Sequence, residues 1–410
     1  MPDLLAKLGA PTSPASATLA HRSLEAVRRH LGMDVAYLSE FIGEDTVFRE
    51  VDAPGLEALI KVGDSRPLEE VYCRHILAGR LPELIPDTGA IPFAASLPIT
   101  TAVPIGAHVS VPIRRADGEV YGMFCCLSAS PRPELNARDL HIVHAFAGMV
   151  AEEIERDHAE REMLAQKTSL VRRALAPGAL SIHLQPICAL AGGQPLGFEA
   201  LSRFSLEPLR KPDAWFADAA ACGLGTELEC AAIDAALAVY DLLPEPFTLS
   251  VNASPETVSG GAFARLVAHR ALDRLTLELT EHAAVECYDA LAAELAPLRA
   301  RGLKLAIDDA GAGFAGLQHI LRLEPDVIKL DMTLIRSIDI DPARRALAGA
   351  MQSFARQTGA VLVAEGVETR EELATLARLS FMRVQGYLLG KPQPWQAALA
   401  ELAPDIAATG

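Results

Sequence analysis

The stretch that decides the fold of this chain runs from residue 275 to residue 331. It reads LTLEL at 275–279, LKLAIDD at 303–309 and VIKLD at 327–331, and longer stretches, which include a helical pattern at 283–301, separate these runs. Short runs rich in Leu, Ile and Val that alternate with amphipathic helices are typical of parallel strands connected by helices. This stretch therefore predicts an α/β fold.

The same alternation of apolar runs and helical stretches continues on both sides and predicts eight strands after residue 178. We place them at 181–187, 196–201, 247–251, 275–279, 303–307, 327–330, 361–364 and 383–389, and helices at 227–242, 255–269, 283–301, 342–358 and 370–379. Eight strands alternating with helices over roughly 230 residues predict a TIM-like (β/α)8 barrel. The first two strands are joined through the short turn Ala191-Gly192-Gly193, which is too short for a crossover helix, so one early strand is expected to be antiparallel.

The residues before the barrel predict a small α+β domain and a long helix. Residues 1–19 are rich in Ala, Pro, Ser and Thr and are expected to form a flexible tail. Predicted helices (23–31, 68–77) and strands (35–38, 108–114, 120–127) place the small domain at 20–138. We expect a connecting helix at 139–175, with an apolar stripe that suits a homodimer, and a barrel domain at 176–410. Two shorter helices with a break near 156–159 are the alternative.

The composition excludes several classes of protein. Hydrophobic residues make up 50% of the chain and charged residues 22%, which is enough apolar material for real cores. The net charge of −16 repels nucleic-acid backbones and anionic membranes, so we expect neither DNA nor membrane as a partner. The seven cysteines show no disulfide or zinc spacing, and no run of 18 apolar residues occurs. A cytoplasmic protein with reduced thiols is expected.

Polar residues stand at or near the ends of almost all the predicted strands. They are Glu199, Asn252, Glu278, Asp308, Asp309, Lys329, Asp331, Glu365 and Gln385. In a barrel such side chains converge over one mouth, where carboxylates repel one another unless cations hold them together. Oxygen ligands favour Mg²⁺, Mn²⁺ or Ca²⁺, and two ions about 3.5–4 Å apart would suit hydrolysis of a phosphate ester. Lys329 and Arg203 add donors for phosphate oxygens. The alternative is that each acid merely caps the following helix.

From residue 178 to about 404 the chain resembles the EAL-domain family of cyclic di-GMP phosphodiesterases. The residues that carry the resemblance are Gln185-Pro186-Ile187, Glu199-Ala200-Leu201 with Arg203, Asn252, Glu278 with Glu281, Asp308-Asp309, Lys329 with Asp331, Glu365-Gly366-Val367-Glu368 and Gln385-Gly386-Tyr387. The resemblance implies hydrolysis of cyclic di-GMP to linear pGpG with two Mg²⁺ or Mn²⁺ ions.

The resemblance also implies a role for each position. Glu199, Asn252, Glu278 and Asp308 would bind one ion, and Asp309 with Glu365 would bind the second, with Asp308 between them. Glu365 would direct the proton of the attacking water, and Lys329 would stabilise the developing charge. Gln185, Arg203, Asp331, Glu368 and Gln385 would bind the substrate, and Glu281 would anchor the loop after the aspartate pair.

One loop departs from the family pattern. Residues 310–316 read AGAGFAG, where the family usually has an aromatic residue at the start and two serines at the end. A catalytically weak or inactive receptor for cyclic di-GMP is therefore the alternative function.

Residues 20–155 resemble the GAF family of small sensory domains. The resemblance is carried by residues 79–87 (GRLPELIPD) and by the hairpin that ends in VYGMFCCL at 120–127. Family members bind cyclic nucleotides, tetrapyrroles, haem or no known ligand. The resemblance implies a regulatory role toward the barrel, and it leaves the ligand of this domain open.

Overall fold

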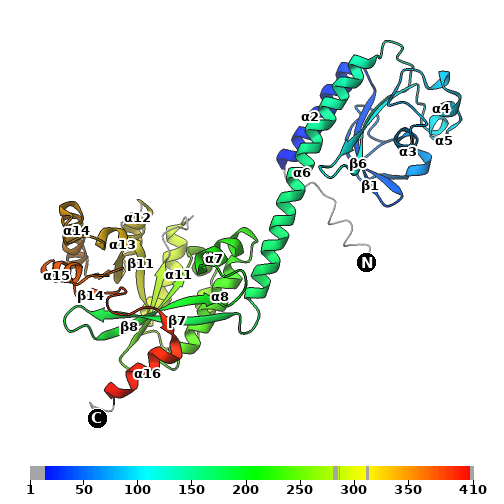
Figure 1. Cartoon of the computed structure of the whole chain (residues 1–410). Helices are drawn as coiled ribbons and strands as arrows, with labels where there is room; N and C mark the ends of the chain where they lie inside the picture. Colours follow the sequence, from blue (N-terminus) through cyan, green and yellow to red (C-terminus); the bar gives the residue numbers. More distant parts are fainter. Residues whose placement is uncertain (1–13, 280–284, 286, 311–313, 407–410) are drawn as a thin grey trace. The chain divides into compact units, whose positions relative to one another are not determined.

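The chain forms two compact units, Met1–Met163 and Leu164–Gly410, each described here by itself (Figure 1). The structure is a computed structural model that describes residues 14–279, 285, 287–310 and 314–406. No helix among these described residues combines the length and the apolar character needed to cross a membrane.

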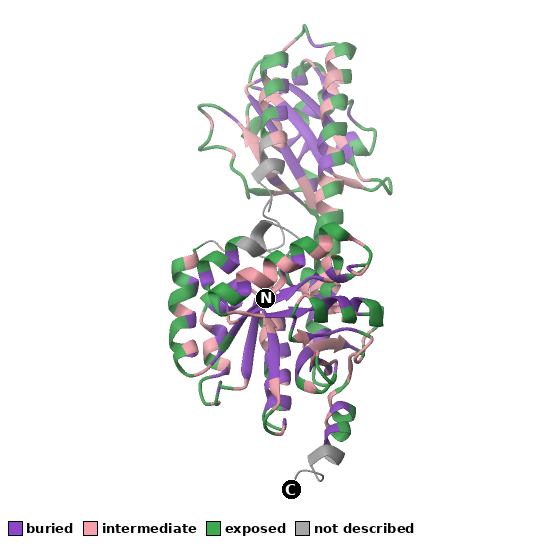
Figure 2. Ribbon diagram, turned by 90° about the vertical axis from the view of Figure 1, so that its left-hand side faces the viewer, coloured by how far each residue is buried: buried purple, intermediate pink, exposed green. Residues whose placement is uncertain are grey.

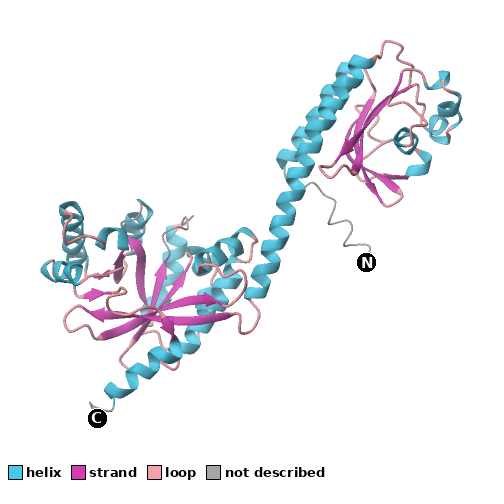
Figure 3. Ribbon diagram, in the orientation of Figure 1, coloured by secondary structure: helices cyan, strands magenta, loops and turns pink. Residues whose placement is uncertain are grey.

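The first unit is built on a six-stranded antiparallel sheet in the order β3-β2-β1-β6-β5-β4 (Figure 3). The strands are β1 (Val35–Ile42), β2 (Asp45–Asp52), β3 (Ser65–Pro67), β4 (Leu84–Ile85), β5 (Ala107–Arg114) and β6 (Val120–Ser128). The helices are α2 (Pro14–Leu31), η1 (Leu68–Glu70), α3 (Tyr72–Leu77), η2 (Thr88–Ala90), α4 (Pro92–Ser96), α5 (Pro98–Ala102) and α6 (Ala137–Ala174).

Alternation along the strands divides the core of this unit into two layers. Ala36 and Leu38 of β1 pack in a cluster with residues of α2 and α6, and Val35 and Tyr37 of the same strand pack in a second cluster with residues of α3. Successive side chains of a strand point to opposite faces, so α2 and α6 cover one face of the sheet and the short helices with their loops cover the other.

The sequence prediction for this unit was incomplete. β2, β3 and β4 were not predicted, and the helix expected at 68–77 is divided into η1 and α3 at Val71, which is extended (φ −112°, ψ 158°). A β-branched residue tolerates that conformation well, and the division lets Leu68, Tyr72 and Ile76 all reach the core.

Helix α6 is continuous through residues 156–159, so the alternative of two shorter helices is wrong. Much of its apolar stripe is covered within the chain, because Val143 and Val150 pack in the first unit and Val171 packs in the second. Only Met149, Met163 and Leu164 of α6 are large apolar side chains recorded as exposed among the described residues.

The second unit is a closed barrel of eight strands. They are β7 (Leu180–Ala189), β8 (Pro195–Phe204), β9 (Thr248–Ala253), β10 (Leu275–Leu279), β11 (Lys304–Ala310), β12 (Val327–Leu330), β13 (Val361–Ala364) and β14 (Arg383–Val384), and β15 (Gln393–Pro394) pairs with β7 at the edge. Strands β8 to β14 are parallel, and β7 closes the ring by antiparallel pairing with both β8 and β14. The predicted barrel with one antiparallel strand is confirmed.

Helices surround these strands. They are α7 (Pro212–Ala221), α8 (Gly225–Tyr240), α9 (Pro255–Ser259), α10 (Ala262–Leu266), α11 (Tyr288–Ala300), α12 (Phe314–Leu323), α13 (Met332–Ile335), α14 (Pro342–Thr358), α15 (Arg370–Arg378) and α16 (Trp395–Ile406). The predicted helix at 255–269 is two short helices, because Gly260-Gly261 interrupts it and Gly261 adopts a left-handed conformation (φ 68°).

The last strand is shorter than predicted. It ends at Val384, and a Cβ atom on Gly386 would lie 2.2 Å from the carbonyl oxygen of Val367. The chain turns there at a close approach that only glycine permits, so residues 385–389 do not continue the strand.

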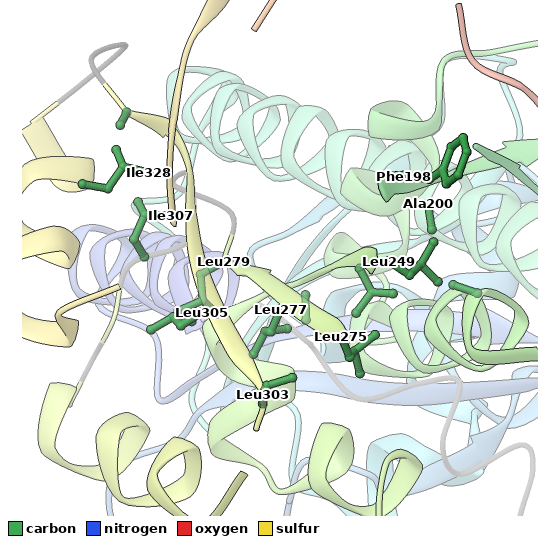
Figure 4. Packing of buried hydrophobic residues seen from close by; sticks show 14 of the residues in the cluster. Phe198, Ala200, Leu249, Leu275, Leu277, Leu279, Leu303, Leu305, Ile307 and Ile328 are labelled. Carbon is green, nitrogen blue, oxygen red and sulfur yellow. The ribbon is translucent and has the colours of Figure 1, made fainter. Parts of the chain in front are cut away.

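The main core of the second unit lies between the strands and the helices. Leu277, Leu305 and Ile328 belong to this cluster, and Figure 4 shows them with their neighbours on successive strands. The strands of the barrel are mostly buried (Figure 2). Because side chains alternate, the residues between these leucines and isoleucines point into the barrel, and that alternation decides where the site can form.

Candidate active site

An apolar layer inside the barrel forms the floor of the site. Ile187, Ala306, Val327 and Val363 pack together as a separate buried cluster. Two residues further toward the mouth on the same strands stand Gln185, Asp308, Lys329 and Glu365. A step of two residues keeps a side chain on the same face of a strand, so a polar layer lies directly above the apolar floor. The step runs backward along the chain on β7 because that strand is antiparallel.

Strand register completes this polar layer. Glu278 of β10 lies opposite Asn252 of β9, and Gln185 of β7 lies opposite Glu199 of β8. Glu199, Glu278 and Lys329 are all at least nine-tenths buried. The register of the barrel strands therefore brings these strand-end residues together at one mouth.

The Lys329 ammonium group lies at the centre of four carboxylates. Its Nζ atom is 2.6 Å from Glu365 Oε1, 2.7 Å from Glu278 Oε2, 3.0 Å from Asp308 Oδ1 and 3.3 Å from Glu199 Oε2. Burial alone would lower the pKa of Lys329, but the carboxylates, Asp308 first, raise it well above its usual value. Lys329 therefore stays charged, and one cation faces four acids.

The excess of negative charge shifts the pKa values of the carboxyl groups by different amounts. Burial raises the pKa of Glu278 to about 8, and the charges of Glu199 and Asp308 add to this rise while Lys329 opposes it. Burial, with the charge of Asp308, also raises the pKa of Glu365 well above its usual value. Glu278 is therefore protonated in part near neutral pH when no other cation is present, and Glu365 holds its proton more strongly than a free carboxyl group does.

Glu199 differs because amide groups support its charge. Gln385 Nε2 donates to Glu199 Oε2 at 2.7 Å, and Asn252 Nδ2 donates to Glu199 Oε1 at 3.0 Å. Burial raises the pKa of Glu199, but Lys329 and these two hydrogen bonds lower it by more, so the pKa lies below its usual value. Gln385 Nε2 also lies 3.2 Å from Gln185 Oε1, which links the amides into one network.

Two groups of carboxylates have oxygen atoms close enough together to hold a cation. Glu199, Glu278 and Asp308 form one group, and Asp308, Asp309 and Glu365 form the other, with one oxygen per residue within 4.8 Å of the rest of its group. Asp308 belongs to both. Its Oδ1 atom and Glu365 Oε1 are buried and accept no hydrogen bond of good geometry from the part of the chain that the structure describes, although Lys329 lies within ion-pair distance of both. Hard oxygen donors with unused acceptor capacity fit Mg²⁺ or Mn²⁺.

Asp309 and Asp331 lie at the edge of this arrangement. Asp309 adopts a left-handed conformation (φ 51°), and burial, with the charges of Asp308 and Asp331, raises its pKa to about 6. Asp331 Oδ1 accepts from the Thr333 backbone N–H at 2.9 Å and caps α13. The alternative that a strand-end acid caps the following helix is therefore correct for Asp331. This cap does not exclude a contact with a substrate.

Two predicted residues lie apart from the carboxylate network. Arg203 Nη1 donates to the Ser202 carbonyl at 2.7 Å. Glu368 Oε1 accepts from Arg336 at 2.6 Å, and the side chains of Glu368 and Arg336 are both close to half exposed. Glu281 lies outside the described residues.

Sequence reasoning missed one residue that positions the site. Glu372 is buried; its Oε1 accepts from the Ser337 N–H at 2.9 Å, and its Oε2 accepts from the N–H groups of Glu368 and Thr369 at 2.9 and 3.1 Å. It thereby fixes the loop after Glu365 to the turn that follows α13. The signal was visible, because Thr369 and Glu372 have the spacing of a capping box, which the structure contains.

Comparison with known proteins gives the same fold and the same two domains. The family model described as "EAL domain" matches residues 169–392, more than half of the chain, and the one described as "GAF domain" matches residues 17–154. The chain is 33% identical to the Pseudomonas aeruginosa cyclic di-GMP phosphodiesterase NbdA over 244 residues, which are 56% of this chain and 31% of NbdA.

Two further similarities are informative. The cyclic di-GMP phosphodiesterase RocR of P. aeruginosa is 28% identical over 55% of this chain and 60% of RocR. The solved structure titled "PaMucR Phosphodiesterase, c-di-GMP complex" is 30% identical, with a TM-score of 0.51 over 57% of this chain and all of that one. The chain spans only between about 29% and 39% of the length of three further curated relatives that it matches. Its barrel unit and the match across residues 169–392 establish that the chain belongs to the EAL-domain family, with a GAF domain ahead of the barrel.

Proposed function

We propose that this protein hydrolyses one phosphodiester bond of cyclic di-GMP and releases linear pGpG. The observation that carries the proposal is the pair of carboxylate groups that share Asp308 at the mouth of the barrel. Relatives with the same domain are named cyclic di-GMP phosphodiesterases, and the similar MucR structure is titled as a complex with this nucleotide. A site of this charge fits a phosphate diester only when cations offset the acid.

The proposed roles follow from the contacts of each side chain. Glu199, Asn252, Glu278 and Asp308 would hold one divalent ion, and Asp308, Asp309 and Glu365 would hold a second, with Mg²⁺ or Mn²⁺ as the candidates. When bound, two such ions lower the pKa of a water molecule and stabilise charge on phosphate oxygens.

The protein's own groups supply the proton transfer and the orientation. Glu365, whose pKa burial raises well above that of a free carboxyl group, would accept the proton of the attacking water. Lys329, held charged at 2.6 Å from Glu365, would stabilise the charge that develops on the phosphate oxygens.

The remaining candidates would bind the substrate. Gln185 and Gln385 face the same network and can bind a sugar or a base edge, and Arg203, Asp331 and Glu368 would bind farther from the ions. Glu281, which lies between β10 and α11 in the sequence, would anchor the loop that follows Asp309.

The receptor alternative differs from the enzyme in one measurable outcome. Purified protein incubated with cyclic di-GMP and Mg²⁺ or Mn²⁺ is expected to release pGpG, detected by chromatography. Glu199→Ala is expected to lower the rate at least 10²-fold, because it removes a ligand and an acceptor of two amide hydrogen bonds. Binding without release of pGpG under both ions would contradict the enzyme proposal and support the receptor.

Metal affinity is expected to rise with pH. A cation binds the ionised form of Glu278, whose pKa of about 8 means that a proton must leave below that pH. The apparent affinity for Mg²⁺ should therefore increase between about pH 6 and pH 8.5, with roughly one proton released per binding event near pH 7. Calorimetry in two buffers of different ionisation enthalpy measures that release, and an affinity that does not change with pH would contradict it.

We further propose that residues 20–138 form a sensory domain, that residues 139–175 connect it to the barrel domain at 176–410, and that the protein is a homodimer. Helix α6, which runs from Ala137 to Ala174, supports the connection. Met149 and Met163 are both exposed and stand fourteen residues apart, which is two heptads and so one face of a coiled coil.

Met163→Glu is expected to convert the dimer to a monomer, because it places a charge on that face. Light scattering measures the mass. Met382→Glu is the matched control, since Met382 is 74% exposed and lies outside α6. A dimer that persists in Met163→Glu would contradict this interface.

A further inference from the structure

A cavity of about 390 Å³ lies in the GAF domain, between the sheet and the short helices and loops that cover the face opposite α2 and α6. Its size falls in the range of small-molecule sites, roughly 300–1,000 Å³. Tyr37, Phe48 and Leu127 line it from the strands, and Leu56, Ile99 and Val103 line it from the segments that cover this face. Most of the other residues around it are also apolar, so it suits a ligand with an apolar body.

Two polar groups in the wall lack the partners that such groups normally have. His108 is 1% exposed, and its Nδ1 atom has no hydrogen-bond partner among the described residues, although the ring also hydrogen-bonds to Cys125. Buried polar atoms are nearly always satisfied, so an unpaired ring nitrogen on a cavity wall indicates a missing partner.

Arg66 is the second group. It is half-buried on β3 and lines the cavity, and no described residue forms an ion pair or a side-chain hydrogen bond with its guanidinium group. The one carboxylate in the lining, Asp34, accepts instead from the Ala129 N–H at 2.8 Å and from Ser128 Oγ at 3.1 Å. An unpaired guanidinium beside an apolar cavity favours an anion of the carboxylate type, which it can bind through two parallel hydrogen bonds.

We propose that this cavity binds a small monocarboxylic acid with an apolar aromatic or aliphatic body. The carboxylate pairs with Arg66, the body fills the space between Phe48, Leu56 and Ile99, and a further polar atom of the ligand satisfies His108. A cyclic nucleotide fits less well, because its ribose and base would leave several polar edges against aliphatic side chains. Leu59, which is 69% exposed, also lines the cavity, so an apolar ligand can reach it from solvent.

The test compares 2-naphthoate, 2-naphthamide and cyclic GMP as ligands of the full-length protein by calorimetry. The acid is expected to bind with a dissociation constant below about 1 mM, and the uncharged amide about ten-fold more weakly. Arg66→Gln should weaken the acid about ten-fold and leave the amide unchanged. Arg80→Gln, an exposed arginine of the same domain outside the cavity lining, is the matched control and should change neither.

A second variant separates cavity binding from binding elsewhere. Val103→Trp fills part of the cavity and should abolish binding of the acid, with the thermal melt of the variant reporting that the domain remains folded. Equal affinity for acid and amide, unchanged affinity in Arg66→Gln, binding of cyclic GMP in preference to the acid, or no binding of the acid would each overturn the proposal. None of these measurements depends on phosphodiesterase activity.

Discussion

Asp308→Asn is expected to reduce hydrolysis of cyclic di-GMP by about 10³-fold or more, a larger effect than that of any other single ligand. Asp308 is the one carboxylate that belongs to both candidate ion sites among the described residues. The amide keeps the size of the side chain but removes the negative charge that both sites share. The loss should appear in kcat at saturating Mg²⁺ and Mn²⁺ alike, because excess metal does not restore a missing ligand.

A matched aspartate shows whether such a loss is specific. Asp326 stands just before β12 at the opposite end of the barrel, where it lies 3.0 Å from Lys304 and 3.2 Å from Arg299. Asp326→Asn should leave kcat within about two-fold and lower the free energy of unfolding by no more than about 1 kcal/mol. If Asp308→Asn retained near-normal kcat, the shared-ligand arrangement would be wrong.

The sequence could predict which residues reach the mouth of the barrel, because the positions of the strands, and so of the residues at their ends, follow from the periodicity of the apolar runs. Glu199, Glu278 and Asp308 each end or interrupt an apolar run, and all three are drawn together by the register of neighbouring parallel strands. The short Gly192-Gly193 connection likewise predicted the antiparallel strand β7, because no helix fits between β7 and β8.

The internal pairing of the site could not be predicted. The sequence pattern indicated that Lys329 is a donor to phosphate oxygens, but it did not show that the ammonium group also lies among four carboxylates. Which strand-end side chains meet depends on the tilt and closure of the barrel, and a strand pattern does not contain that information. The share of the apolar stripe of α6 that stays exposed could not be predicted either, since Val143 and Val171 are covered by different units of the same chain.

Lys329→Met is expected to lower the free energy of unfolding of the metal-free protein by about 3–5 kcal/mol and the rate of hydrolysis by about 10²–10³-fold. The substitution keeps much of the apolar stem but leaves four clustered carboxylates without their buried cation. Burial and mutual repulsion already raise the pKa of Glu278 and Glu365 in the presence of Lys329. Loss of the lysine raises both further.

The pH and the metal should change the loss of stability in Lys329→Met in opposite directions. Groups with a raised pKa in the folded state destabilise it as they ionise, so the stability gap to the wild type should widen from about pH 6 to pH 8.5. Mg²⁺ or Mn²⁺ supplies positive charge to the same oxygens and binds only the folded site, so saturating metal should narrow the gap.

Lys304→Met is the matched control. Lys304 is exposed, and its ion pair with Asp326 at 3.0 Å is worth at most about 1 kcal/mol. Neither pH nor metal should change the stability of this variant relative to the wild type in the same way. Chemical unfolding of both variants with and without metal measures these differences. Equal stability of the two variants in the absence of metal would show that the carboxylates do not depend on Lys329 for their charge balance.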